Sequence, residues 1–242
     1  MRLPLTCFEC RFDPAPMEPN LYVADFQEPG IYLVTCDKGH RVAYCLQQQR
    51  FEVLFEAGLV AVADGYYREA VSSFATSLER FWEFFSSVIT SDRGISEENW
   101  ASTWKMIQNQ SERQLGAFVM AHLLHLGTVP TGLTEKEVAF RNSVIHKGHI
   151  PQRSEAIGFA TTVLKLVSPL LDELKEHYPS AVNQSVKRHV EQLGKTVTSG
   201  FRICYLSNPT VISVSRALSE PVPTLEEAIG RYERSRLRHP RG

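Results

Sequence analysis

The sequence predicts a mainly α-helical protein, in which a helical bundle follows a small β segment and precedes a mixed C-terminal extension. From residue 46 to residue 178, apolar side chains recur with the period of about 3.6 that marks amphipathic helices. The first 45 residues differ, because short β-like runs alternate there with cysteines and prolines. Residues 179–242 combine weakly helical and β-like stretches. We therefore expect three parts: 1–45, 46–178 and 179–242.

The composition is that of an ordinary soluble protein, with 242 residues, 43% hydrophobic and 22% charged, and a net charge of −1. Such a chain has no global field that attracts nucleic acid, so any RNA contact needs a local basic patch. No apolar run is expected to reach the length that spans a bilayer. Pro4, Cys7 and Glu9 interrupt the N-terminal stretch where a signal peptide would have its apolar core. We expect a cytoplasmic protein with no membrane partner.

Cysteines in a cytosolic protein are metal ligands or free thiols more often than disulfides. Cys7 and Cys10 form a Cys-x2-Cys pair, and Cys36 and His40 form a second pair after an interval of 25 residues. Three thiolates and one imidazole make the complete tetrahedral set of a structural zinc site, as in a zinc ribbon. Cys45 could replace His40, but we expect it to begin the next helix. The alternative is two unrelated pairs of buried thiols.

Six helices are expected in the middle part of the chain, and the second of them has a dense aromatic face typical of a core or of a helix–helix interface. His122 and His125 lie on the fourth helix with no carboxylate or cysteine at metal-ligand spacing nearby, so we interpret them as ordinary helix-face histidines. The expected helices are about 47–65, 66–89, 96–107, 111–126, 134–146 and 154–178.

The β-like runs lie at both ends of the chain: 21–23, 31–35, 201–206 and 211–214. We expect the last two to form a hairpin around residues 208–209. A final helix should begin at Thr224 and run into a series of arginines. That basic tail is either a patch for RNA or an acidic partner, or simply a solvated end.

The fifth helix carries the most informative stretch. Thr134 and Glu137 form a capping box at its start. Arg141 and His146 lie in its last turns, five residues apart, which corresponds to about 140° around an ideal helix. Asn142 and His146 share a face. Arg141 and His146 converge only if the helix end unwinds or if a second copy of the motif faces the first.

A guanidinium and an imidazole at this spacing suit phosphate chemistry. Arg141 can bind two phosphate oxygens at once, and His146 can transfer a proton near neutral pH. Asn142 can orient either group. The alternative is that both cations merely complement the negative end of the helix dipole.

At these residues the sequence resembles the HEPN superfamily, whose signature is Arg-x4-His at a helix end and whose members include nucleases and nucleotide-binding domains of toxin and defence systems. The resemblance covers residues 47–178 in helix pattern, and its specific match is Arg141-Asn142-x3-His146. It implies metal-independent RNA cleavage at a homodimer interface, with Arg141, Asn142 and His146 as the catalytic residues and a possible antitoxin or regulatory protein as partner. It also makes Glu79, on an adjacent helix, a candidate support for the motif.

Two other interpretations stay open. One is a non-catalytic HEPN-like module that binds a nucleotide, RNA or a protein. The other is a zinc-ribbon adaptor whose helical part serves only as an oligomerisation scaffold.

Overall fold

The structure is a computed structural model that describes residues 2–12, 21–208 and 210–238. The chain divides into two compact units, each described here by itself. Unit 1 comprises residues 1–48 and 186–208, and unit 2 comprises residues 49–185 and 209–242. The segment expected to be a C-terminal extension, 179–242, therefore contributes to both units. Some prolines of the N-terminal segment and the arginine at position 241 lie outside the described residues.

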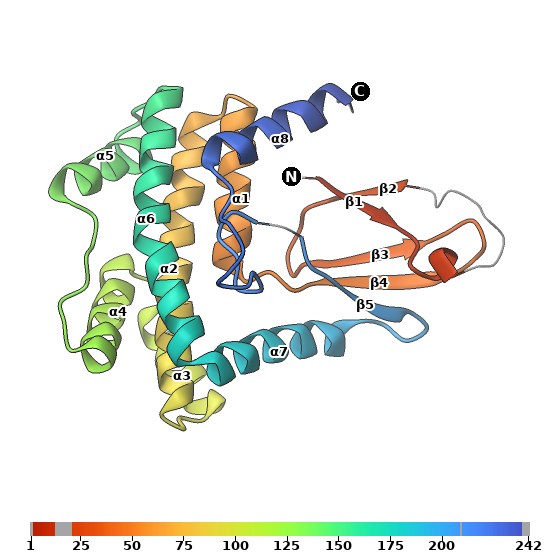
Figure 1. The fold of residues 1–242 in the computed structure, drawn as a ribbon, viewed down its shortest axis with the longest axis horizontal. Helices are drawn as coiled ribbons and strands as arrows, with labels where there is room; N and C mark the ends of the chain where they lie inside the picture. Colours follow the sequence, from red (N-terminus) through yellow and green to blue (C-terminus); the bar gives the residue numbers. More distant parts are fainter. Residues whose placement is uncertain (1, 13–20, 209, 239–242) are drawn as a thin grey trace. The chain divides into compact units, whose positions relative to one another are not determined.

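Unit 1 contains two small sheets (Figure 1). In the first, β1 (Arg2–Thr6) pairs antiparallel with β2 (Leu21–Asp25). In the second, β4 (Arg41–Leu46) lies between β3 (Ile31–Thr35), which is antiparallel to it, and β5 (Arg202–Leu206), which is parallel. The strands expected near 21–23, 31–35 and 201–206 are confirmed.

The expectation that Cys45 begins a helix was wrong. It lies in β4, where Val42 and Cys45 have no exposed surface. β4 is buried from Val42 to Leu46, so both of its faces are covered and apolar and polar residues do not alternate there. Periodicity alone cannot distinguish such a run from a buried helix.

The hairpin expected between residues 201–206 and 211–214 was also wrong. β5 instead adds to β4, and the backbone of residues 211–214 forms bends rather than a strand. Helix α7 (Pro179–Thr196) leads to β5, and His189 Nε2 lies 3.1 Å from the carbonyl oxygen of Leu46 at the end of β4. Apolar runs beside a turn are the usual signal of a hairpin, but partner choice is decided by burial.

All six helices expected between residues 46 and 178 are confirmed. They belong to unit 2, together with a C-terminal helix whose start at Thr224 is also confirmed. The helices are α1 (Arg50–Ala63), α2 (Tyr67–Asp92), α3 (Glu97–Ile107), α4 (Ser111–Leu126), α5 (Glu135–His146), α6 (Arg153–His177) and α8 (Leu225–Arg238).

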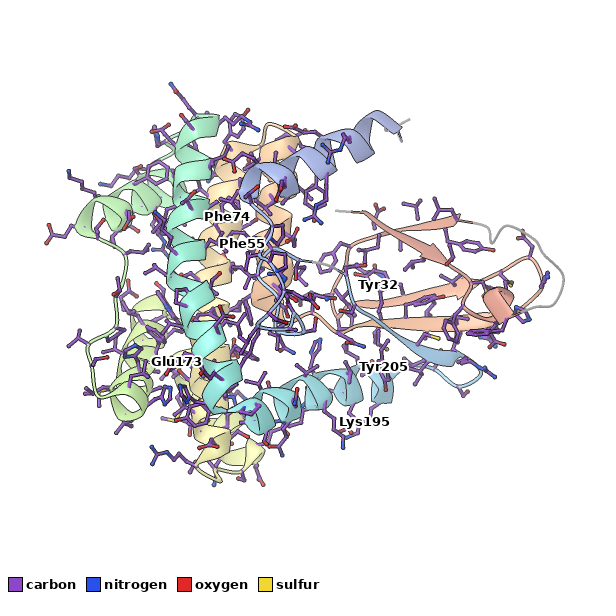
Figure 2. All side chains as sticks on the ribbon, viewed as in Figure 1. Tyr32, Phe55, Phe74, Glu173, Lys195 and Tyr205 are labelled. Carbon is purple, nitrogen blue, oxygen red and sulfur yellow. The ribbon has the colours of Figure 1, made fainter. Side chains whose placement is uncertain are left out.

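Helix α2 is the centre of unit 2, with α1, α4, α5 and α6 packed against it (Figure 1). Its aromatic face forms the core. The rings of Phe55 and Phe74, labelled in Figure 2, lie 5.0 Å apart between centroids. Gly58 of α1 permits this approach, because a Cβ at that position would lie 2.4 Å from the Phe74 ring.

Helix α6 bears on the expectation that no apolar run reaches the length that spans a bilayer. Residues Arg153–His177 meet the criteria of length and composition, with a hydropathy of 1.2 over the best window. A third of that window is buried inside the protein. A single such helix is weak evidence of a span, because the core helix of a soluble protein meets the same criteria.

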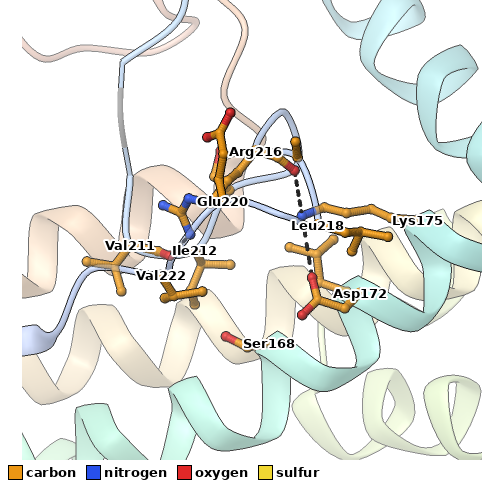
Figure 3. A pocket seen from close by; sticks show the side chains of 12 residues that line it. Ser168, Asp172, Lys175, Val211, Ile212, Arg216, Leu218, Glu220 and Val222 are labelled. Carbon is orange, nitrogen blue, oxygen red and sulfur yellow. Dashed lines mark hydrogen bonds and ion pairs between the residues drawn. The ribbon is translucent and has the colours of Figure 1, made fainter.

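The segment that follows β5 is fixed to unit 2 by two buried carboxylates of α1. Glu52 accepts a hydrogen bond of 3.0 Å from the amide of Val214, and Glu56 accepts one from the amide of Val211. Lys175 of α6 donates to the carbonyl oxygen of Arg216 at 3.2 Å, beside a small pocket shown in Figure 3. This explains why residues 211–214 are buried without forming a strand.

Candidate functional site

The motif helix α5 begins as the sequence predicts. Thr134 Oγ1 accepts a hydrogen bond from the Glu137 amide at 3.4 Å, and the Glu137 carboxylate accepts one from the Thr134 amide at 2.7 Å. Thr162 of α6 donates to the same carboxylate at 2.7 Å, which ties the start of α5 to α6. One face of α5 packs against the rest of unit 2, since Val144 is buried and the Phe140 ring contacts the Phe159 ring of α6.

Glu79 of α2 meets Arg141 of α5. An Arg141 guanidinium nitrogen lies 2.7 Å from Glu79 Oε1, and another donates to Asn142 Oδ1 at 3.0 Å. The side chains of Glu79 and Arg141 are 17% and 20% exposed, so the pair is largely shielded from water. A charge-assisted hydrogen bond in such a setting fixes the guanidinium in one orientation. The family resemblance made Glu79 a candidate support for the motif, and the structure brings it into contact with Arg141.

His146 is exposed at the last position of α5. Among the described residues, no hydrogen bond or ion pair joins it to Arg141. Because α5 stays helical through His146, the angular separation of about 140° between the two side chains persists. Of the two routes to convergence, unwinding of the helix end is therefore not used, and a second copy of the motif remains.

The predicted metal ligands come together in unit 1. The ligand atoms of Cys7, Cys10, Cys36 and His40 all lie within 4.8 Å of one another, so the cluster could hold a metal ion. Cys10 Sγ is 3.8 Å from Cys36 Sγ and 3.5 Å from His40 Nδ1. Tetrahedral zinc sites, with bonds of about 2.3 Å to sulfur and about 2.0 Å to nitrogen, separate their ligands by about 3.8 Å (S–S) and about 3.5 Å (S–N). The separations of Cys10 from Cys36 and His40 fit that geometry.

Backbone hydrogen bonds shape the two turns that carry the ligands. In the second turn, the Cys36 amide donates to the His40 carbonyl at 3.0 Å, and Gly39 adopts a φ of +80° that favours glycine. In the first, the Phe8 amide donates to Tyr44 Oη at 2.9 Å, and that hydroxyl donates to the Thr6 carbonyl. A side chain of β4 thus holds the first turn in place.

The cluster shifts the ionisation of two of its thiols in opposite directions. Burial alone would raise the pKa of Cys36, but backbone hydrogen bonds at His40 and Lys38 lower it. Burial and the neighbouring thiols of Cys7 and Cys36 together raise the pKa of Cys10 to about 11. A divalent cation reverses this effect, because a coordinated thiol loses its proton outright. The donor set therefore suits a soft or borderline cation rather than a hard one.

The basic C-terminal helix is partly described. The side chains of Arg231 and Arg234 are exposed on α8, and Arg153 of α6 reaches Glu233 at 3.4 Å. The side chains of the arginines further along the helix lie outside the described residues, so the tail as a binding patch stays a prediction.

Sequence analysis missed the partners of His125. Tyr178 contacts one of its ring nitrogens, and Glu173 of α6 faces the other. The signal present in the sequence was Glu173 and His177 at a spacing of four on one helix, a pairing that only the packing of α6 brings to His125.

The comparisons with known proteins yield no relative. No protein-family model matches the chain, and no curated protein and no solved structure matches it. The function is therefore argued from the two clusters themselves.

Proposed function

We propose that the protein is a metal-independent endoribonuclease of HEPN type. The observation that supports it is the hydrogen-bonded set of Glu79, Arg141 and Asn142 beside an exposed His146 at one helix end. An arginine held in a single orientation and a solvent-facing imidazole are the groups that, once a second chain brings them together, would recognise a phosphodiester and move a proton at it.

In the proposed reaction, the 2′-hydroxyl of the RNA attacks the adjacent phosphorus. Its proton passes to the imidazole of His146 acting as base, while Arg141 stabilises the charge on the phosphorane oxygens. The 5′-oxygen leaves and takes a proton from an imidazolium acting as acid. The products are a 2′,3′-cyclic phosphate and a 5′-hydroxyl, with no metal ion and no net proton change.

The proposal includes a homodimer. Within one chain the two side chains point about 140° apart around α5, so a second α5 is needed to place an arginine opposite a histidine. Two copies also supply two imidazoles, one for each proton transfer. A toxin-like or defence-like role in the cytoplasm, under the control of an antitoxin or other regulatory protein, is part of the same proposal.

We further propose that Cys7, Cys10, Cys36 and His40 hold a structural zinc ion in a zinc-ribbon-like module. Four protein ligands leave no coordination position open for a substrate, so the ion would stabilise unit 1 rather than catalyse a reaction. The cysteine cluster belongs to unit 1 and Arg141 to unit 2, so the two proposals can be tested independently.

The test is cleavage of a mixed RNA pool with no added divalent metal. We expect the wild type to leave cyclic phosphate ends, and His146→Ala to lose at least about 100-fold in rate, since acid–base groups contribute about 10²–10⁴-fold. Arg141→Ala should lose activity similarly. His149→Ala is the matched control, an exposed histidine just past the same helix end. Equal cleavage by the His146→Ala and His149→Ala proteins would refute the assignment.

One observation favours a second candidate, an RNA- or nucleotide-binding module without catalysis. Glu79 already neutralises Arg141 at 2.7 Å, and a neutralised guanidinium attracts phosphate less strongly. In that case the folded dimer would cleave nothing, and Glu79→Gln would tighten RNA binding. If the protein is a nuclease that uses Glu79 for positioning, Glu79→Gln would lower the cleavage rate instead.

A further inference from the structure

A buried imidazole nitrogen without a hydrogen-bond partner lies where α4 meets the end of α6. The side chain of His125 is only 5% exposed, and its Nε2 atom is buried and makes no hydrogen bond. The nearest carboxylate oxygen, Glu173 Oε1, is 3.8 Å away, which is too far for a hydrogen bond. A buried polar atom without a hydrogen bond destabilises the folded state, so the missing partner of His125 Nε2 requires an explanation.

The other nitrogen of the same ring is already engaged. Tyr178 Oη contacts His125 Nδ1, and burial raises the pKa of Tyr178, so the phenol keeps its proton. When Nδ1 is protonated and donates to the phenol oxygen, Nε2 presents a lone pair toward Glu173. Metal-binding histidines are typically held in this way, with the second ring nitrogen fixed by a hydrogen bond.

A third ligand group lies near Glu173 and would have to turn to reach the same ion, because the His125 and His177 ring centroids are 6.4 Å apart. His177 lies one turn beyond Glu173 on α6, and its Nε2 atom is 3.3 Å from the same Glu173 Oε1. Two ligand atoms bound at about 2.0–2.1 Å on a tetrahedral zinc ion are separated by about 3.3 Å. The His177 side chain is 53% exposed, so it can turn toward His125 without disturbing the core.

We propose that His125, Glu173 and His177 form a second metal site, distinct from the cysteine cluster, for a divalent transition metal such as Zn²⁺. Two imidazoles and a carboxylate are borderline ligands that suit this class of ion and disfavour Ca²⁺ and Mg²⁺. The ion would join α4 to the end of α6, each of which packs against α2 (Figure 2 labels Glu173). Three protein ligands leave one tetrahedral position for water or another ligand.

The surrounding charges agree with a neutral His125. Burial lowers the pKa of this imidazole most, the Glu173 carboxylate raises it, and His177, His122 and Arg93 lower it again. A neutral imidazole is the form that binds a metal. Arg93 opposes a bound cation, whereas Glu173 favours it.

The test is calorimetric titration of the full chain with Zn²⁺ after one equivalent has been added to fill the cysteine cluster. We expect a second, weaker equivalent, together with a rise in the melting temperature of unit 2 that grows with Zn²⁺ concentration. His177→Gln should weaken this second step at least about tenfold, since even the loss of an outer-shell partner costs about 10–100-fold in metal affinity. Because His177 is exposed, this substitution leaves the core intact.

His149→Gln is the matched control, because His149 also faces a carboxylate, Glu155 Oε1 at 3.7 Å, with both side chains similarly exposed. It should leave the second step unchanged. The proposal would be overturned if the wild type bound only one equivalent of Zn²⁺. It would also be overturned if His177→Gln and His149→Gln weakened the second binding step equally. RNA cleavage is not part of the readout, so the result is independent of the proposed nuclease function.

Discussion

At the scale of single residues, the least expected feature is the buried acid Glu52 on α1. It is 2% exposed, accepts hydrogen bonds from the amides of Gln49 and Val214, and holds the 211–214 segment in unit 2. Burial raises its pKa from 4.5 to about 7, although these amides and Lys175 limit the rise. The folded state therefore binds the proton more tightly than the unfolded chain.

The pKa of Glu52 leads to a prediction about stability and pH. The contribution of the protonated group is fully present below pH 4.5 and is lost as the pH rises to about 7. A shift of this size corresponds to about 3 kcal/mol. Relative to Glu52→Gln, the wild type should lose about that much free energy of unfolding across this window. Urea unfolding followed by tryptophan fluorescence measures it, since all three tryptophans lie in unit 2.

Glu137 provides the control of opposite sign. It too is the third residue of a capping box, but hydrogen bonds from Thr134 and Thr162 outweigh its burial and lower its pKa. Its contribution is present above the unfolded pKa and is lost as the pH falls. Parallel pH curves for the wild type and the Glu52→Gln protein would contradict the prediction.

At the scale of the element, α5 shows how local signals position a site. Its start is fixed by the Thr134 capping box, and it ends at His146, two residues before Gly148 with its φ of +74°, so the motif residues fall in the last turns of a short helix. The hydrophobic pattern of this helix is weak, because only Val144 is buried. The caps and the Glu79–Arg141 pair therefore matter more here than apolar packing.

This leads to a prediction about the cap. Thr134→Ala removes the side-chain acceptor for the Glu137 amide and should lower the local stability of α5 by about 1 kcal/mol. Amide hydrogen exchange should show faster exchange in the first turns of α5. Thr224→Ala, in the similar box with Glu227 at the start of α8, should affect α8 instead. Faster exchange of α5 in both variants would show that the effect is not local.

At the scale of the whole molecule, the chain passes from unit 1 into unit 2, returns once to unit 1 and ends in unit 2. The β4–β5 pairing closes unit 1 with a segment from the C-terminal third of the sequence. The described part of unit 1 has five short strands and a small apolar core, and domains of this kind commonly depend on a metal for stability.

Removal of the proposed zinc should therefore unfold one unit and spare the other. We expect a chelator, or Cys10→Ser, to abolish hydrogen-exchange protection in β3, β4 and β5, while tryptophan fluorescence from unit 2 stays native-like. Cys204→Ser is the control, because this thiol lies outside the ligand cluster. Loss of metal without loss of protection in these strands would show that the ion is not structural.

Local features were determined by the sequence itself. The approximate helix bounds, the caps at Thr134 and Thr224, and the four Cys and His residues that come together all depend on residues close together in the chain or on ligand chemistry. A helix forms its hydrogen bonds within one segment, so periodicity and capping residues define it without knowledge of the rest of the molecule.

Only the tertiary structure decided the contacts between distant segments. These include the pairing of β5 with β4, the ion pair between Glu79 and Arg141, and the approach of Glu173 to His125. A strand completes its hydrogen bonds with a partner that can come from anywhere in the chain, and a helix-surface side chain acquires a neighbour only when helices pack. Local sequence signals do not distinguish between the possible partners of such a strand or side chain. The physical reason is that burial, and not local propensity, selects among them.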